Sequence, residues 1–368
     1  MTTLSPSIAG LDLTSTPTAS PTPPARIAAL TDSPKYGVIF TDHMLTIEWT
    51  QERGWHDASL RPREPFRIDP ACSVLHYAQE IFEGMKAYRG ADDATYLFRP
   101  MANATRFQES ARRMSMPELP ESLFIESVER LVQSERAWIP QGESGSLYLR
   151  PFMFATEPFL GVRPSRSYVF CIIASPVGAY FAGGVKPISV WVSGLYARSA
   201  HGGTGAAKTG GNYAGSLIAQ MEAGRNGCDQ VLFLDAAEHC WLEELGGMNI
   251  FVQMADGTLI TPPLGTILPG ITRDSIISLA REEGVVVEEK AYSKDMLFAD
   301  ATAGRVTEVF ACGTAAVVTP IGSFRAYEGE VTIGDGNEGP RTRALRERLL
   351  GIQRGGLDDG FGWRHRVR

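Results

Sequence analysis

The chain has 368 residues, of which 43% are hydrophobic and 9% aromatic, and its formal net charge is −7 at pH 7. This length allows two packed domains, and the composition is ordinary for a globular protein. The negative charge argues against nucleic acid or an anionic membrane as a partner, and no apolar run approaches the ~18 residues that cross a bilayer.

Five cysteines are scattered along the chain without a C-x-x-C pair. This pattern argues against a disulfide framework or a zinc site, so we expect no metal and a reducing, cytoplasmic location. Residues 1–35 lack the basic and apolar runs of a secretory signal and are rich in Ser, Thr and Pro. They are expected to form a mobile arm.

Residues 36–178 are expected to form a small α/β domain. Apolar residues three and four positions apart predict helices over Asn103–Arg113 and Glu121–Trp138. The apolar and β-branched segments 146–158 and 167–178 predict strands, the second of them buried on both faces.

Residues 179–187 are rich in Gly and predict an interdomain connection, followed by a large domain over 188–368. In this domain we expect helices, strands, a hairpin with an Asp-Gly turn and a tight turn between two strands. These elements are predicted at 216–227, 229–235, 248–262, 271–284, 285–292, 305–324 and 339–355. The mixture of helices with hairpins predicts an α+β fold in two domains.

The segment GGTGAAKTGGNYAGS (202–216) comes close to a phosphate loop, and Asp235 ends an apolar run as a magnesium-binding Asp would. However, Ala207 replaces the glycine that must precede Lys208, because the backbone has to approach the phosphate closely. Two glycines also follow Thr209, where each disfavours a helix by roughly 1 kcal/mol. A nucleotide hydrolase is therefore the less favoured interpretation.

A lysine can instead act as a covalent catalyst by forming an imine with a carbonyl. If the carbonyl belongs to pyridoxal phosphate, the site also needs an anion cradle, an acid beside the pyridine nitrogen and donors for the substrate carboxylate. The predicted helix that begins at Gly270 offers a cradle, since free N–H groups at a helix start attract anions. Glu243 and Glu244 lie just before a Gly-Gly turn and could supply the acid.

Eight motifs occur in order along the chain: HYAQEIFEGMKAYRG (76–90), LFRP (97–100), SLYLRP (146–151), SPVGAYFAGG (175–184), KTGGNY (208–213), ELGGMN (244–249), LPGITR (268–273) and GTA (313–315). Together they resemble the motifs of branched-chain amino acid aminotransferases, which are fold type IV pyridoxal-phosphate enzymes. The resemblance covers about residues 36–355, and the five-residue step from Glu244 to Asn249 selects Glu244 over Glu243. The resemblance implies two domains with the active site between them.

The resemblance also implies roles for individual residues. Lys208 would form the internal aldimine and move the substrate proton, Tyr213 would bond the phenolic oxygen of the cofactor, and Glu244 would pair with its pyridine nitrogen. The phosphate would be bound by Arg99, Ile271, Thr272 and Thr314, with Gly270 at the start of the same helix and Arg198 close by.

Substrate contacts are implied for Tyr77, Phe82, Tyr148, Arg150, Tyr180, Thr314 and Ala315. A loop with Leu160 and Val162 would reach the other subunit of a homodimer. The implied reaction is reversible transfer of the amino group of leucine, isoleucine or valine to 2-oxoglutarate, in a ping-pong order. A D-amino acid aminotransferase and an aminodeoxychorismate lyase are alternatives within the same fold.

Overall fold

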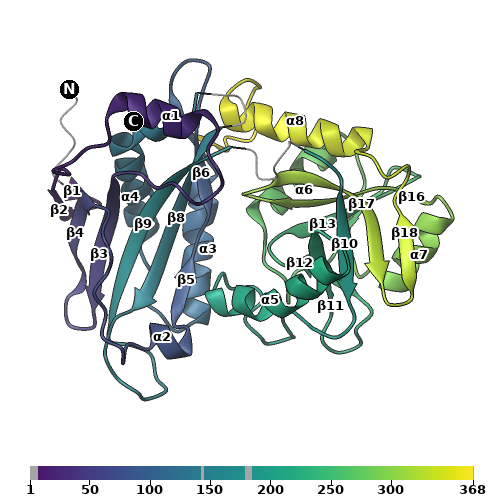
Figure 1. Ribbon diagram of the computed structural model, residues 1–368, viewed down its shortest axis with the longest axis horizontal. Helices are drawn as coiled ribbons and strands as arrows, with labels where there is room; N and C mark the ends of the chain where they lie inside the picture. Colours follow the sequence, from purple (N-terminus) through teal and green to yellow (C-terminus); the bar gives the residue numbers. More distant parts are fainter. Residues whose placement is uncertain (1–6, 142–144, 179–184, 368) are drawn as a thin grey trace. The chain divides into compact units, whose positions relative to one another are not determined.

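A computed structural model describes residues 7–141, 145–178 and 185–367 (Figure 1). The chain divides into two compact units, a first unit of Met1–Tyr180 with Ile352–Arg368 and a second unit of Phe181–Gly351. The division falls in the predicted connection 179–187, part of which lies outside the described residues. Ile352–Arg368, however, belong to the first unit, so the expected domain 188–368 is wrong at its C-terminal end.

The first unit is built on one large, mostly antiparallel sheet. Its strands are β1 (Ser7–Ile8), β2 (Leu11–Ser15), β3 (His43–Thr50), β4 (Gly54–Pro62), β5 (Glu80–Phe82), β6 (Met85–Arg89), β7 (Thr95–Phe98), β8 (Ser146–Ala155), β9 (Ser167–Val177) and β19 (Arg364–Arg366). Their order is β1-β2-β4-β3-β9-β8-β6-β7-β19, with β5 paired to β8. The helices are α1 (Pro24–Asp32), α2 (Val74–Tyr77), α3 (Pro100–Arg113), α4 (Glu121–Ser134) and the 3-10 turn η1 (Arg136–Trp138).

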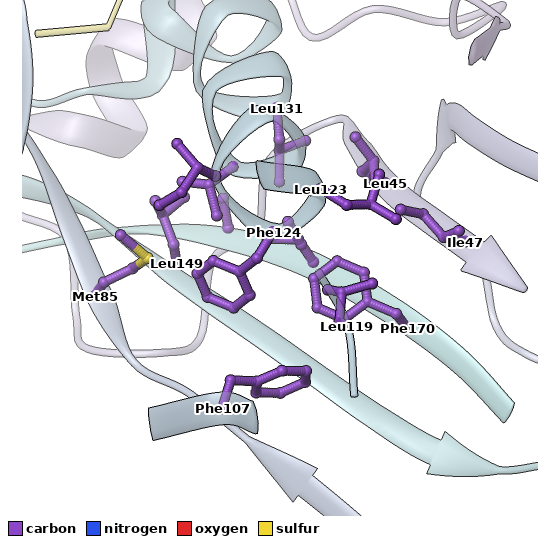
Figure 2. Close-up of a cluster of buried hydrophobic side chains, with 14 of the residues drawn as sticks. Leu45, Ile47, Met85, Phe107, Leu119, Leu123, Phe124, Leu131, Leu149 and Phe170 are labelled. Atoms are coloured by element: carbon purple, nitrogen blue, oxygen red, sulfur yellow. The ribbon is translucent and has the colours of Figure 1, made fainter. Parts of the chain in front are cut away.

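The core of the first unit lies between this sheet and the helices α3 and α4 (Figures 1 and 2). Phe107 of α3, Phe124 of α4 and Phe170 of β9 are fully buried, and their ring centroids lie 5.5–6.0 Å apart. Residues 104, 107 and 111 face the core because three- and four-residue steps share one side of a helix. The two helices were predicted from this spacing, and the structure confirms both, although α4 ends at Ser134 and the predicted end at Trp138 belongs to η1.

The prediction of a mobile arm at residues 1–35 is wrong for the part that the structure describes. Ile8 is fully buried, and β2 pairs in parallel with β4 from Leu13 to Ser15. Ile27 of α1 is also buried in the core. The Ser-, Thr- and Pro-rich composition concealed a few apolar residues that fit an edge of the sheet, and such short edge strands carry little periodicity.

The second unit holds a second sheet with both parallel and antiparallel pairs. Its strands are β10 (Ile188–Ser193), β11 (Gln230–Leu234), β12 (Leu242–Leu245), β13 (Asn249–Met254), β14 (Leu259–Thr261), β15 (Val287–Glu289), β16 (Val306–Gly313), β17 (Val317–Ala326) and β18 (Gly329–Thr332). Their order is β12-β11-β10-β17-β16-β13-β14-β15, with β18 paired to β17. The helices are α5 (Gly210–Arg225), α6 (Ile271–Glu282), α7 (Lys294–Thr302) and α8 (Pro340–Arg354), whose last residues belong to the first unit.

Most predicted elements of the second unit agree with the structure to within a few residues. Two elements differ from the prediction, and the first is α5, which begins at Gly210 and not at residue 216. The first N–H groups of a helix have no partner inside it, so glycine is tolerated better there than in the interior. The predicted strand 285–292 is shorter than expected, at Val287–Glu289. No helix in the described part of the chain is long and apolar enough to span a membrane.

We predict that Phe124→Ala lowers the free energy of unfolding by about 3–5 kcal/mol, because it removes a fully buried ring that its neighbours cannot replace. Urea unfolding followed by circular dichroism measures the change. Met101→Ala is the control, since Met101 of α3 is 54% exposed and should change stability by less than about 0.5 kcal/mol. Equal losses in the two variants would contradict this account of the core.

Candidate active site

Lys208 lies at the end of the loop that precedes α5. Its ammonium Nζ donates a hydrogen bond to the hydroxyl of Tyr213 at 2.8 Å. Tyr213 stands in the first turn of α5, and both residues are half-buried. The first turn of α5 thus places the phenol of Tyr213 next to the amine of Lys208, five residues earlier in the chain.

Asn212 fixes the shape of the loop before Lys208. Its side-chain Nδ2 donates to the carbonyls of Thr204 at 2.8 Å and Ala207 at 2.9 Å, and its Oδ1 accepts from the Thr204 hydroxyl at 2.6 Å. These bonds join the loop to the first turn of α5, which accounts for the early start of the helix at two glycines. Sequence reasoning quoted Asn212 within a motif but gave it no role.

Glu244 of β12 is 2% exposed and has polar partners from three other segments. Its Oε1 lies 2.6 Å from Nη1 of Arg198 and accepts the backbone N–H of Leu268 at 2.9 Å. Asn249 donates to Oε2 at 3.4 Å and to the carbonyl of Leu268 at 3.1 Å. Burial raises the pKa of Glu244 to about 7, while Arg198, the Leu268 N–H and Lys208 oppose this rise.

Arg198 is placed on the carboxylate of Glu244, where sequence reasoning had expected a phosphate ligand. Its side chain is 1% exposed. Among the described residues, its Nε and Nη2 have no hydrogen-bond partner. Two buried nitrogen donors without an acceptor lower the stability of the fold, unless an acceptor on a bound ligand takes their hydrogen bonds.

Three glycine-containing turns lie against this group of residues. An added side-chain carbon at Gly247 would meet the Tyr213 ring at 3.7 Å, and one at Gly313 would meet the Gly247 carbonyl at 3.5 Å. At Gly270 the same carbon would overlap Oδ1 of Asn249. The motifs at 208–213, 244–249, 268–273 and 313–315 therefore meet in one region of the second unit.

Gly270 precedes α6, with Ile271 as its first residue and Thr272 6% exposed in the first turn. Thr314 and Ala315 form the turn between β16 and β17 and are half-buried. The start of α6 and this turn are suited to binding an anion, because both present backbone N–H groups.

In the first unit, three of the predicted substrate residues come together. Nη2 of Arg150 donates to the Tyr148 hydroxyl at 3.1 Å, and the Arg150 guanidinium lies 4.8 Å from the centroid of the Phe82 ring. Tyr36 packs edge-on against Tyr148, with ring centroids 5.3 Å apart. Sequence reasoning had used Tyr36 only to mark the start of order. A side chain at Gly84 would strike the Tyr148 hydroxyl at 2.2 Å, so the glycine makes room for it.

The other predicted substrate residues lie elsewhere. Tyr77 is 47% exposed on α2, and its hydroxyl donates to the carbonyl of Leu160 at 3.1 Å. Leu160 and Val162 are themselves 74% and 88% exposed. Tyr180 lies outside the described residues.

Arg99 lies just before α3, and its guanidinium carbon is 5.0 Å from the centroid of the Trp363 ring. Its backbone N–H donates to the carbonyl of Trp363 at 2.7 Å. This contact with the C-terminal residues could not be predicted from the sequence, since the last residues were assigned no role.

The magnesium site that a phosphate loop would require is not supported by the geometry of Asp235. Its carboxylate accepts backbone N–H groups from residues 237, 238, 240 and 241. It therefore closes the turn after β11.

Glu243 directly precedes Glu244 in β12, and burial raises the pKa of its carboxyl as well. Adjacent residues of a strand point to opposite faces, so the Glu243 side chain leaves β12 on the other side from Glu244.

Comparison with known proteins agrees with this grouping of motifs. A family model of the class IV amino-transferases matches residues 80–324. The branched-chain-amino-acid aminotransferase of Mycolicibacterium smegmatis is 52% identical over 362 residues, which are 97% of this chain and 98% of the relative. The chain belongs to the class IV aminotransferases, in their branched-chain group.

Solved structures agree with this class IV aminotransferase assignment. The Escherichia coli branched-chain amino acid aminotransferase matches with a TM-score of 0.73 at 29% identity, over 88% of this chain and 99% of that one. A second branched-chain amino acid aminotransferase, from T.th. and solved with pyridoxamine 5′-phosphate, also matches with a TM-score of 0.73, at 30% identity over 88% of this chain and 98% of that one. The predicted resemblance and the α+β fold type IV architecture are confirmed.

We predict that Gly270→Ala lowers the free energy of unfolding by about 1–3 kcal/mol, because the new methyl group would displace the buried Asn249 side chain from its bonds. Thermal unfolding measures the effect. Gly215→Ala is the matched control: Gly215 is in α5 with open space around it, so alanine should stabilise the helix by about 0.5–1 kcal/mol. An unchanged stability in Gly270→Ala would contradict the packing described.

Glu244 should make the cofactor-free protein less stable as the pH rises. Folding raises the pKa of this carboxyl from 4.5 to about 7, so the folded state holds its proton more tightly than the unfolded state. The resulting contribution to the free energy of unfolding is complete below pH 4.5 and is lost as the pH rises through 7. We expect Glu244→Gln to reduce the loss of unfolding free energy between pH 5 and 8 by roughly 1–3 kcal/mol.

Urea unfolding at the two pH values measures this difference. Glu347→Gln, which changes an exposed carboxyl on α8, should keep the pH dependence of the unchanged protein. If Glu244→Gln behaves like this control, Glu244 does not titrate in that range.

Proposed function

We propose that this aminotransferase binds pyridoxal 5′-phosphate and transfers the amino group of leucine, isoleucine or valine to 2-oxoglutarate, reversibly. The observation that carries the proposal is the hydrogen bond between Lys208 and Tyr213, in the same region as the buried carboxyl of Glu244. The names of the similar enzymes support the choice of substrates.

The residues of the second unit fit this cofactor. Glu244 is suited to face the pyridine nitrogen, since a cation beside a buried carboxyl lowers its pKa and keeps it ionised. Nε and Nη2 of Arg198 are buried donors that an acceptor on a ligand would satisfy. The start of α6 at Gly270, Ile271 and Thr272 would hold the phosphate, together with Thr314.

Arg198 therefore has two tasks in this proposal. Its Nη1 lies 2.6 Å from the Glu244 carboxylate and favours the ionised form, and its Nε and Nη2 would donate to an acceptor on the cofactor. In the first unit, Arg99 is the proposed phosphate ligand, because a guanidinium can bind phosphate through two parallel hydrogen bonds.

When bound, pyridoxal phosphate supplies a protonated ring that withdraws electrons from the substrate α-carbon. Nζ of Lys208 would take the proton from the α-carbon of the donor amino acid and deliver it to C4′ of the cofactor, and in the second half-reaction it would carry a proton from C4′ to the α-carbon of the acceptor. The Tyr213 hydroxyl keeps Nζ oriented through the 2.8 Å bond. In the ping-pong order, the first amino acid leaves as a 2-oxo acid before 2-oxoglutarate enters and leaves as glutamate.

Substrate recognition would combine an apolar wall with one cation. Phe82 supplies apolar surface for a branched side chain, and Arg150 with Tyr148 offers donors for a carboxylate. The backbone N–H groups of Thr314 and Ala315 are the proposed site for the α-carboxylate. The proposed enzyme must also accept glutamate, whose second carboxylate needs a donor inside apolar surroundings.

We also propose that the protein is a homodimer. Leu160 and Val162 are large apolar side chains that are 74% and 88% exposed, and Tyr77 holds the loop through the carbonyl of Leu160. Apolar exposure of this kind is suited to contact with another subunit. The cytoplasmic location stays a prediction from cysteine usage; all five cysteines lie in the described residues and none is paired.

We predict that purified protein with pyridoxal phosphate is yellow and that borohydride fixes the cofactor on Lys208, as peptide mapping would show. Lys208→Ala should lose at least about 10⁴-fold in kcat, because it removes the group that is proposed to move the α-proton. Lys290→Ala, which removes an exposed lysine of the same unit, should keep its activity.

A panel of amino donors with 2-oxoglutarate then tests the substrates. Formation of glutamate from leucine, isoleucine and valine, and not from D-amino acids, is the expected result. Preference for D-amino acids, or release of pyruvate from aminodeoxychorismate, would favour the alternatives within the same fold. A colourless protein that takes up no pyridoxal phosphate would overturn the proposal.

A further inference from the structure

The C-terminal tail, residues 355–367, returns to the sheet of the first unit. Its strand β19 pairs with β7, with Arg364 opposite Phe98 and Arg366 opposite Tyr96. The N–H of Val367 donates to the carbonyl of Thr95 at 2.9 Å, which extends the pairing beyond the strand. The tail is therefore part of the sheet at the point where β7 leads into α3.

Trp363 precedes β19, and it contacts Arg99 through both backbone and side chain. The backbone N–H of Arg99 donates to the Trp363 carbonyl at 2.7 Å. The guanidinium carbon of Arg99 lies over the indole, 5.0 Å from the ring centroid. A cation on the face of a Trp ring is attracted by the ring's electrons, and Trp is the strongest of the aromatic residues in this respect.

The backbone of Arg99 needs such support. Its φ of 49° and ψ of 46° lie in the left-handed region, which is unfavourable for a residue with a side-chain carbon. Conformations of this kind persist where the surroundings determine them, and they concentrate at functional sites. The bond to Trp363 and the start of α3 at Pro100 hold the backbone on either side, so they set the direction in which the Arg99 side chain leaves.

Trp363 is itself held in place by aromatic neighbours. Phe361 stacks parallel to it, with ring centroids 4.2 Å apart and planes at 9°, and Phe98 packs against it edge-on at 5.7 Å. Behind it, the N–H of Arg364 donates to the Asp359 carboxylate at 2.6 Å. The indole is thus a fixed surface rather than a freely turning side chain.

The guanidinium carbon of Arg99 lies over the face of the indole, and the planar fork of an arginine is suited to binding a phosphate through two parallel hydrogen bonds. Its long side chain has also lost much of its conformational freedom before the ligand arrives, which lowers the entropic cost of binding.

We propose that the C-terminal tail is a positioning element for the cofactor phosphate, in which Trp363 fixes the backbone and the guanidinium of Arg99. This inference rests on the proposed function, because it takes Arg99 as a phosphate ligand. Trp363 touches no cofactor in this proposal and acts only through Arg99.

The test compares Trp363→Leu with Trp363→Phe in the apoenzyme. Leucine keeps apolar volume but removes the aromatic face, whereas phenylalanine keeps a face. Dissociation constants are measured by absorbance titration for pyridoxal phosphate and for pyridoxal, which lacks the phosphate. We expect Trp363→Leu to weaken pyridoxal phosphate about five- to tenfold and pyridoxal less than about twofold, and Trp363→Phe to restore most of the affinity.

Two controls separate positioning from general support. Trp55→Ala removes a tryptophan of the same unit that bonds the carbonyl of Glu118, and it should leave the ratio of the two dissociation constants unchanged. Arg99→Ala should weaken pyridoxal phosphate selectively, and adding Trp363→Leu to it should have no further effect on that ratio.

An equal loss of pyridoxal and pyridoxal phosphate in Trp363→Leu would overturn the inference, as would additive effects in the double variant. A normal ratio in Arg99→Ala would also overturn it, while the proposed function would stand. Failure of the unchanged protein to bind pyridoxal phosphate at all would overturn the proposed function as well, so the two failures are distinguishable.

Discussion

The buried carboxyl of Glu244 is the constraint on which the candidate site depends. A carboxylate that is 2% exposed is unfavourable unless partners surround it, and those partners come from separate segments of the second unit. Arg198 lies in the loop after β10, Leu268 in the loop before α6, and Asn249 at the start of β13. Satisfying one acid therefore brings together the loop that leads to Lys208 and the start of α6.

Close backbone approach is the second condition of the same site. At Gly270 a side-chain carbon would overlap Oδ1 of Asn249, so this position requires glycine, whereas at Gly247 and Gly313 it would make only ordinary van der Waals contacts with its neighbours. Asn249 thus connects the acid to the start of α6, and Asn212 does the equivalent for the loop before Lys208. Both amides stand inside motifs that the sequence offered, but the sequence did not indicate that their side chains join these segments.

Elements with strong periodicity could be predicted from the sequence, whereas elements formed by pairing at an edge could not. The helices α3 and α4 carry apolar residues three and four positions apart, and these residues are buried in the core as expected. The strands β2 and β19 are short, and nothing in Leu11–Ser15 or Arg364–Arg366 indicates a partner. Their pairing with β4 and β7 depends on which sheet edge is available, a property of the assembled first unit.

The sequence by itself determined the family, the α+β class and the identity of the motif residues, because these depend on residue types at fixed spacing. Ala207 and the two glycines after Thr209 separated the segment 202–216 from a phosphate loop before any geometry was known. Only the tertiary structure decided that Arg198 pairs with Glu244 and that Trp363 lies on Arg99. Such contacts join residues that are far apart in the chain, and their energy depends on burial and distance, which spacing along a sequence does not contain.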